Sequence, residues 1–472
     1  MRRFGFLGLM AYLFIKFGLV HEFVAAKTGI DTRMILLSTG LAAFAAIFGG
    51  TAKRLLKSRI GLLILLFSIW MVLAIPTSVW RGGSATYVFT FYWRTIFPMF
   101  LAMVVLPVGL LNIRSALLAA SWGAVVASLI GRTFSSAGGG GRAELDFGSI
   151  KNSGDLAAFF MVSIPFLLFL FQNTKNWAVK LVVVVLFLSN LQLVLSTAAR
   201  SALVAFAVAV VFVLIWGSGK LRVFVLFLGL VGAPVASVVL PSSVLNRLAS
   251  LAGETGTDEA MEAEGSKEAR RAVAMRALKY TLQRPIFGVG PNVFQDYDAK
   301  VTLDAGARRA QWQETHNGYL QISVELGIPA LLFKVGAMVS AFLLLRRTYV
   351  NSRKVPELAL LSSCSFCLMG SLVMAMVFEL FLSQGYAFWT FCVMGLTAAL
   401  EFSLREDPAL ARYGKLLRIA NHYGGVPVTV SPAAAPPAAN VPARGPVIKQ
   451  VPGIRPNDSP TVKLGGRPRI LR

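Results

Sequence analysis

Uncharged stretches long enough to cross a lipid bilayer recur along most of this chain of 472 residues. Each holds roughly the 20 residues that a hydrocarbon core about 30 Å thick requires. Because backbone polar groups find no water in lipid, each stretch is expected to form an α-helix. The clearest stretches are Met34–Ala52, Ile60–Trp80, Thr95–Ile113, Leu156–Thr174, Leu181–Ala199, Ser201–Gly219, Val223–Leu245, Leu358–Phe378 and Leu380–Leu400. Weaker ones are Phe4–Val20, Ser115–Gly131 and Tyr319–Leu345.

The composition agrees with a membrane protein. Hydrophobic residues make up 56% of the chain and charged residues 14%, and the mean hydropathy is +0.67. We therefore predict an all-α, polytopic membrane bundle of about twelve transmembrane helices. The basic start resembles a signal peptide, but no Ala-x-Ala site closes the first apolar stretch, so we expect a retained first helix.

The basic residues that give the chain its net charge of +24 are unevenly distributed between its expected loops. Basic residues collect in alternate short loops, the pattern of cytoplasmic loops, which predicts that both termini are cytoplasmic and argues against a nucleic-acid partner. We expect a membrane domain at 1–402, with its large helical loop at about 241–316 on the outer side. A smaller outer loop runs from Arg132 to Asp155. A basic Pro/Ala-rich tail at 403–472 is expected to be disordered and cytoplasmic.

Two cysteine or acidic patterns could suggest metal or redox chemistry. Cys364 and Cys367 form a CxxC pattern, but they lie with Cys392 in expected spans without further ligands, so we interpret all three as core residues. Asp296-Tyr297-Asp298 has the spacing of a DxD metal motif, and we interpret it as a polar loop.

The large outer loop has segregated charges, with acidic residues first and basic residues after them. Lys267–Arg284 has helical periodicity, with one apolar face opposite an Arg/Lys face. A basic amphipathic helix on the outer side suits either an anionic lipid headgroup or a position on the bilayer surface. The apolar face consists of Ala272, Met275, Leu278 and Leu282.

Four short motifs follow one another in the chain. Ser196-Thr197-Ala198-Ala199-Arg200-Ser201-Ala202 begins a helix, and Pro285-Ile286-Phe287-Gly288-Val289-Gly290-Pro291-Asn292-Val293-Phe294 lies in the large loop. His316-Asn317-Gly318-Tyr319-Leu320 stands where this loop re-enters the membrane, and Glu325-Leu326-Gly327-Ile328 follows it. In this order and topology, the motifs closely resemble the O-antigen ligase/polymerase superfamily of membrane glycosyltransferases over about 195–332.

This resemblance implies a metal-independent glycosyltransferase of the bacterial inner membrane that needs no cofactor. It would use an undecaprenyl-diphosphate-linked glycan as donor, with Arg200, Arg270 and His316 as the catalytic set. The chemistry fits these residue types. Guanidinium groups bind a diphosphate without losing their charge, and imidazole exchanges a proton near neutral pH.

Further residues are candidates for substrate binding. Arg271 and Arg276 are alternatives to Arg270 for contact with phosphate, and Arg94 lies near the outer end of an expected span. Asn317 follows His316, and Asn152 could contact the donor sugar. Glu325 is expected to be a buried interhelical partner. Gly288 and Gly290 are expected to allow a tight turn over the site.

The motifs leave the acceptor open. A ligase would transfer O-antigen onto lipid A-core, a polymerase would extend a growing glycan, and a protein O-glycosyltransferase would modify a protein. A transporter of lipid-linked sugars is a fourth possibility. It is disfavoured because Arg200, Arg270 and His316 map to the outer boundary, whereas a transporter binds its substrate at mid-depth.

Overall fold

The structure is a computed structural model that describes residues 2–30, 32–48, 54–92, 100, 109–138, 142–145, 147–150, 152–239, 258–306, 312–411 and 413. All of them belong to one compact unit, Met1–Gly424. The expected polar tail lies outside the described residues from 414 onward.

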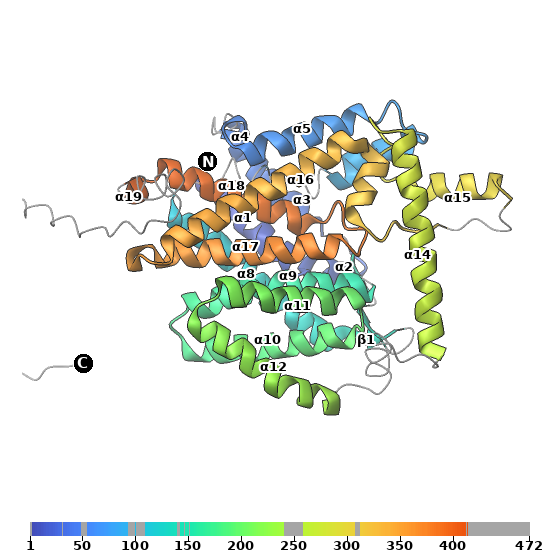
Figure 1. Ribbon diagram of the computed structural model, residues 1–472. Helices are drawn as coiled ribbons and strands as arrows, with labels where there is room; N and C mark the ends of the chain where they lie inside the picture. Colours follow the sequence, from blue (N-terminus) through green and yellow to red (C-terminus); the bar gives the residue numbers. More distant parts are fainter. Residues whose placement is uncertain are drawn as a thin grey trace, which may run out of the picture. The chain divides into compact units, whose positions relative to one another are not determined.

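Helices make up nearly all of this unit (Figure 1). The first half contains α1 (Arg2–Phe17), α2 (Val20–Thr28), α3 (Met34–Phe48), α4 (Arg54–Lys57), α5 (Arg59–Leu73), α6 (Arg81–Tyr87), α8 (Leu110–Phe134), α9 (Ser153–Asn173), α10 (Trp177–Ser196), α11 (Arg200–Trp216) and α12 (Gly219–Val239). The second half contains α14 (Asp258–Gln283), α15 (Phe294–Asp304), α16 (Gly318–Ser352), α17 (Ala359–Glu379), α18 (Phe388–Glu406) and α19 (Pro408–Ala411). A π-helical turn at Val88–Tyr92 follows α6, and a 3-10 turn at Pro356–Leu358 precedes α17.

Five helices in the described ranges are long and apolar enough to cross a membrane, or six if the bent pair α1 and α2 counts as one span. The expected number of twelve is therefore not confirmed. Every expected span nevertheless overlaps a helix, although most of Thr95–Ile113 lies outside the described residues. Part of the difference arises because several of these helices are shorter than 18 residues, among them α5 and α11.

One short element departs from the all-α prediction. In the smaller loop, β1 (Ser135–Ala137) pairs antiparallel with β2 (Ala143–Leu145), and Ser135 lies opposite Leu145. The Gly138 N–H donates to Arg142 O at 2.7 Å, which extends the pairing toward the turn. The Arg142 side chain then donates from Nε to Thr197 O at 3.0 Å, so the hairpin is tied to the turn before α11.

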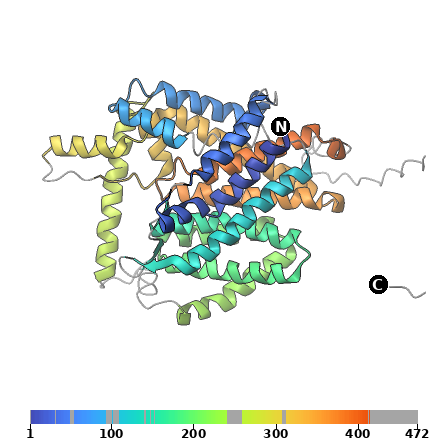
Figure 2. The same cartoon turned by 180° about the vertical axis from the view of Figure 1, so that it is seen from behind.

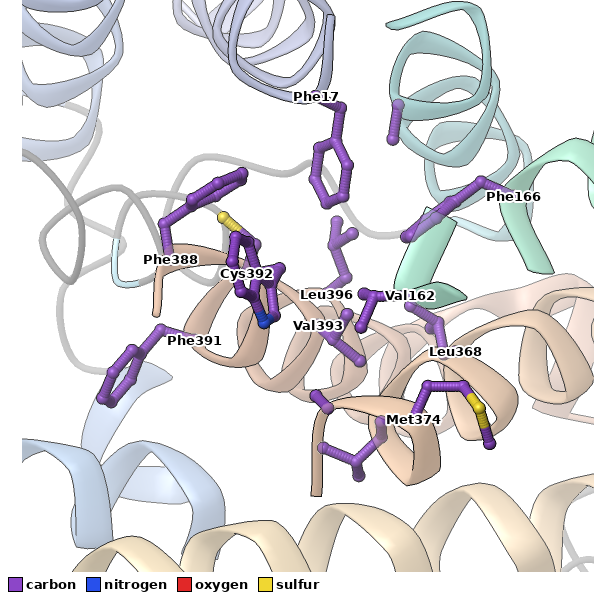
Figure 3. Close-up of a cluster of buried hydrophobic side chains, with 14 of the residues drawn as sticks. Phe17, Val162, Phe166, Leu368, Met374, Phe388, Phe391, Cys392, Val393 and Leu396 are labelled. Carbon is purple, nitrogen blue, oxygen red and sulfur yellow. The ribbon is translucent and has the colours of Figure 1, made fainter. Parts of the chain in front are cut away.

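The core lies where α1, α8, α9, α17 and α18 meet (Figure 3). Phe17 packs on Phe166 and Phe388, with ring centroids 4.9 and 5.6 Å away. Small polar side chains join neighbouring helices, as in other membrane bundles: Ser371 Oγ donates to Val162 O at 2.9 Å. The three cysteines are buried in α17 and α18, as expected.

The two ends of the bundle differ in character. At one end α4 and the end of α18 meet: Arg54 bonds Glu406 at 3.1 Å, and Arg405 donates to Lys57 O. At the other end, α14 runs crosswise over the ends of α16 and its neighbours (Figures 1 and 2). The predicted site motifs gather at this second end.

Candidate active site

The glycine-rich loop and the Glu-x-Gly-Ile motif pack against each other. α16 is interrupted at Gly327, whose φ of 83° and ψ of 174° are not helical. This break frees backbone groups that bond the loop before α15. Three bonds join the two segments: Val289 N–H to Val324 O at 2.9 Å, Gly290 N–H to Glu325 O at 2.9 Å, and Ile328 N–H to Pro285 O at 2.8 Å.

Glycine is required at this junction for two reasons. Gly288 and Gly290 have φ of +67° and +121°, which disfavour side-chain residues. A Cβ on Gly288 would also lie 2.4 Å from the backbone carbon of Glu325, and one on Gly327 would lie 2.0 Å from Ile286 O. The expected tight turn is confirmed. The glycines stand where the backbone of the loop comes close to the backbone of α16.

Glu325 holds this junction to the next loop. Its side chain is 3% exposed and accepts hydrogen bonds from Tyr386 OH at 2.8 Å and from the Asn292 N–H at 3.0 Å. Its burial agrees with the expectation, but its partners are loop residues rather than residues of another helix, because Asn292 precedes α15 and Tyr386 precedes α18.

His316 lies in the turn that leads into α16. Its φ of +49° is rare for a residue with a side chain, and its N–H donates to Ser383 Oγ at 2.9 Å. Thr315 Oγ1 lies 3.2 Å from the same hydroxyl. The half-buried imidazole has a lowered pKa, first because of burial and second because of the positive charge of Arg270. His316 is therefore neutral near pH 7.

Arg270 comes close to His316 because of how α14 packs. Val273, Ala277 and Tyr280 form the buried face of this helix, which lies against Phe294 and its neighbours. The apolar face predicted from the sequence points outward instead. Met275 is 61% exposed and Leu278 and Leu282 are exposed beside it. The helix also begins at Asp258, before the predicted start at Lys267.

Arg276 forms a buried structural cluster. Its Nε and a terminal nitrogen donate to the two oxygens of Asp298 at 2.7 and 2.8 Å, and it reaches Gln313 Oε1 at 3.2 Å. Tyr280 OH donates to Asp298 at 3.1 Å, and burial beside this carboxylate raises the pKa of Tyr280 to about 12. The polar-loop interpretation of Asp296-Tyr297-Asp298 is wrong, because these residues lie in α15 and Asp298 points inward.

The other predicted arginines differ in environment. Arg200 begins α11 directly after a turn in which Ala198 has a φ of +46°, and its guanidinium has no hydrogen bond or ion pair among the described residues. Arg271 is exposed on α14. Arg94 lies outside the described residues.

Both predicted asparagines cap helices. Asn317 Oδ1 accepts from the N–H groups of Tyr319 and Leu320, and its amide donates to Leu380 O at 3.1 Å. Asn152 accepts from the Asp155 N–H at 2.8 Å at the start of α9. Such caps satisfy otherwise free N–H groups, and the capping position of each asparagine was a readable signal in the sequence.

A cavity of about 370 Å³ lies next to the turn that carries His316, but His316 is not one of its lining residues. Glu314 and Thr315 line it, and so do side chains from the segment between α17 and α18 that the sequence motifs did not indicate. Partial enclosure and the nearby Asp155 carboxylate raise the pKa of Glu314. Its lining also includes Lys16, Asp155, Gln384, Phe388 and Trp389. Within the part of the chain that the structure describes, no cluster of His, Cys, Asp or Glu has the makings of a metal site.

A comparison with known families bears on the class of protein. Residues 185–335 match the O-antigen ligase family. The chain contains an O-antigen ligase domain. This confirms the resemblance to the O-antigen ligase superfamily over these residues and supports a membrane glycosyltransferase of the ligase or polymerase type.

The O-antigen ligase domain includes Arg200, Arg270 and His316, together with the glycine-rich loop and the break in α16. The cavity next to the turn of His316 is completed from outside the domain, by Asp155 of α9 and by the segment before α18. No curated protein matches the chain.

Proposed function

We propose that this protein transfers a glycan from a polyprenyl diphosphate to an acceptor hydroxyl at the periplasmic face of the inner membrane. The acceptor of an O-antigen ligase is lipid A-core. The observation that carries the proposal is the turn that holds His316 through its bond to Ser383, with the positive charge of Arg270 acting on the imidazole. His316 and Arg270 lie in the ligase domain, at the end of the bundle away from the basic connection of α4 and α18.

The arginines would bind the donor diphosphate. Transfer breaks the bond between the anomeric carbon and a diphosphate oxygen, so negative charge develops on the leaving group. Fixed guanidinium groups stabilise such charge without a metal ion. Arg270 is well placed for this role because of its proximity to His316. Arg200 lacks a protein partner in the described ranges, and Arg271 is exposed one position away.

His316 would act as general base. As the acceptor oxygen forms its bond to the anomeric carbon, its proton passes to the neutral imidazole, and the lipid diphosphate leaves. A lowered pKa keeps the imidazole free to accept this proton. The positive φ and the bond to Ser383 fix the backbone from which the side chain projects.

The proposed topology places both termini in the cytoplasm and the polyprenyl tail in the bilayer. The positive-inside rule supports it. So does the position of α14 across one end of the bundle, where a basic helix could lie at the membrane surface (Figure 1).

Reconstitution in lipid nanodiscs tests this proposal. Purified protein is given an undecaprenyl-diphosphate-linked oligosaccharide alone, and then together with lipid A-core. A ligase forms product only when lipid A-core is present. Longer lipid-linked chains from the donor alone would show a polymerase instead. No product with either substrate, together with movement of the donor between leaflets, would show a transporter and overturn the proposal.

A further inference from the structure

A lysine and a glutamate form an ion pair in the interior of the bundle. Lys334 Nζ of α16 lies 2.7 Å from Glu379 Oε2 at the end of α17, and both side chains are fully buried. α16 is long and apolar enough to cross a membrane. Ionisable side chains inside such a helix are rare and costly, and by default they point to a function.

Stability alone is a weak explanation for this pair. The free energy of taking two charges out of water roughly offsets their attraction in the interior. Replacing a buried ion pair by apolar side chains of similar volume is therefore often neutral or stabilising, whereas removing one partner is strongly destabilising. The bonds that the pair makes to its surroundings give a better account of its presence.

The pair also binds the backbone of the non-helical segment 380–387, between α17 and α18. Lys334 Nζ donates to Gly385 O at 2.6 Å, and Glu379 Oε1 accepts from Thr390 Oγ1 at 3.0 Å. Gly385 is buried, and a buried backbone carbonyl needs a hydrogen-bond donor. In a membrane protein, backbone that is not helical is tolerated where other protein groups satisfy it. The lysine ammonium group supplies such a bond.

Gly385 is held from both sides of the break in α16. Its N–H donates to Gln321 Oε1 at 3.0 Å. Gln321 precedes the break at Gly327, whereas Lys334 follows it. Gly385 also packs closely on the start of this helix, because a Cβ on it would lie 2.8 Å from Gly318 O. The position of the segment is therefore fixed relative to both halves of α16.

The same segment holds the turn of His316. Ser383 stands two residues before Gly385, and its Oγ accepts the hydrogen bond of the His316 N–H at 2.9 Å. Because only Gln384 separates Ser383 from Gly385, a displaced glycine also displaces the hydroxyl that holds the turn. A continuous series of bonds therefore leads from Lys334 to His316.

We propose that Lys334 and Gln321 are positioning residues for glycan transfer. By holding Gly385 from both halves of α16, they set the turn from which His316 acts. Glu379 provides the counter-charge that holds the Lys334 ammonium group in place. The inference rests on the glycan transfer proposed above. In this role neither side chain touches the reacting atoms, so its loss lowers the rate of transfer more than the binding of substrates.

The double variant Lys334→Met with Glu379→Leu tests the proposal. It leaves no buried charge, so its melting temperature in detergent should stay within about 4 °C of wild type. Lys334→Met alone should melt lower, because Glu379 then lacks a counter-charge. The double variant still lacks the bond to Gly385, and we expect its kcat to be about five- to tenfold lower, with KM for either substrate within about twofold.

The same substitutions in another ion pair are the matched control. Arg54→Met with Glu406→Leu removes the pair between α4 and the end of α18, at the other end of the bundle, and should leave kcat and KM unchanged. Recovery of stability without recovery of kcat in the double variant of Lys334 and Glu379 supports a positioning role. Wild-type kcat in that variant would overturn the proposal, because the pair would then serve the fold alone.

Gln321→Met is a second test that does not depend on the folding of the double variant. It leaves no charge unpaired and frees the N–H of Gly385. Glu325, on the next turn of α16, keeps its bonds to Tyr386 and Asn292. We expect kcat to fall about fivefold, as for one lost hydrogen bond. An unchanged kcat in folded Gln321→Met would also overturn the proposal.

Chemical labelling separates failure of this inference from failure of the proposed function. Diethyl pyrocarbonate reacts with neutral imidazole, and its rate of reaction at His316 is measured by mass spectrometry on nanodisc protein without substrate. Labelling should be several-fold faster in the double variant of Lys334 and Glu379, because a freed turn exposes the half-buried ring, and unchanged in the control. If wild type transfers no glycan but labelling differs in this way, the proposed function fails and the positioning role stands. If wild type transfers glycan but the double variant changes neither labelling nor kcat, the positioning role fails alone.

Discussion

The backbone N–H of His316 donates to Ser383 Oγ at 2.9 Å, and this bond joins the ligase domain to the segment between α17 and α18. The same segment supplies Gln384 to the cavity wall, and Trp389 follows at the start of α18. The turn that carries His316 and this side of the cavity wall are therefore held together by one segment of the chain.

Replacing Ser383 with alanine should reduce catalysis more than binding. The lost bond holds His316 in its left-handed conformation, so we expect kcat to fall about fivefold, which corresponds to roughly 1 kcal/mol, with KM little changed. Steady-state kinetics on the reconstituted enzyme measure both. Ser363→Ala is the control, since Ser363 bonds Gln172 and Asn173 away from the site. Equal kcat values for Ser383→Ala and wild type would contradict a positioning role.

Arg270→Ala should change the pH dependence of the reaction. The positive charge of Arg270 disfavours the imidazolium form and helps to lower the pKa of His316. Without this charge the pKa rises toward the ordinary value of about 6.5. The general base is then lost at a higher pH, and the acidic limb of the kcat profile moves to higher pH. Arg271→Ala should leave the limb in place, and a limb that stays fixed in Arg270→Ala would refute the electrostatic link.

Arg276→Ala should destabilise the protein because it leaves the buried carboxylate of Asp298 unpaired. Asp298 is fully buried, and removal of the guanidinium leaves its carboxylate without a counter-charge, at a cost of about 3 kcal/mol. Thermal unfolding in detergent should show a clear fall in melting temperature. The double variant Arg276→Met with Asp298→Leu should be more stable than Arg276→Ala, because no charge remains buried. Wild-type stability of Arg276→Ala would show that the pair contributes nothing.

Gly327→Ala should disrupt the junction between α16 and the glycine-rich loop. The added Cβ would lie 2.0 Å from Ile286 O, and the φ of +83° disfavours alanine. We expect a loss of about 3 kcal/mol or more, seen as poor yield and a low melting temperature. Gly336→Ala in the same helix is the control. Its Cβ would only touch Leu63 at 3.4 Å, and alanine favours the helix by about 0.5–1 kcal/mol. Equal tolerance of both variants would contradict the role assigned to Gly327.

The sequence predicted best those features that depend on residues close together in the chain, such as apolar spans and short motifs. Hydropathy located most of the helices, because a spanning helix must be apolar over its whole length. The order of the motifs around Gly288, His316 and Glu325 predicted the ligase resemblance, which the family match at 185–335 confirms. A tight turn at Gly288 and Gly290 was expected because glycine tolerates positive φ, and both residues have a positive φ.

Contacts between distant segments could not be predicted in the same way. Arg276 and Asp298 lie on different helices, and nothing in their local sequence indicates that they pair. The inward face of α14 carries Val273, Ala277 and Tyr280, which is no more apolar than the outward face with Met275 and Leu282. Tertiary packing alone selects between these two faces.

The segment that contributes Gln384 and Trp389 to the cavity wall was also not predicted from the sequence. Gln384 and Trp389 stand in an apolar stretch that was predicted as part of a span beginning at Leu380. The structure places Leu380 to Ala387 outside the helices and starts α18 at Phe388. A loop of this length is hidden in a hydropathy profile because most of its residues are apolar.

The central claim is that His316 is the general base, and single-turnover transfer by His316→Gln tests it most directly. Enzyme in nanodiscs is loaded with lipid-linked oligosaccharide and mixed with lipid A-core, and binding of the donor is measured in parallel. The account predicts donor affinity within about twofold of wild type and a transfer rate lowered by about 10²- to 10⁴-fold. Transfer at the wild-type rate by His316→Gln, with donor binding intact, would contradict it.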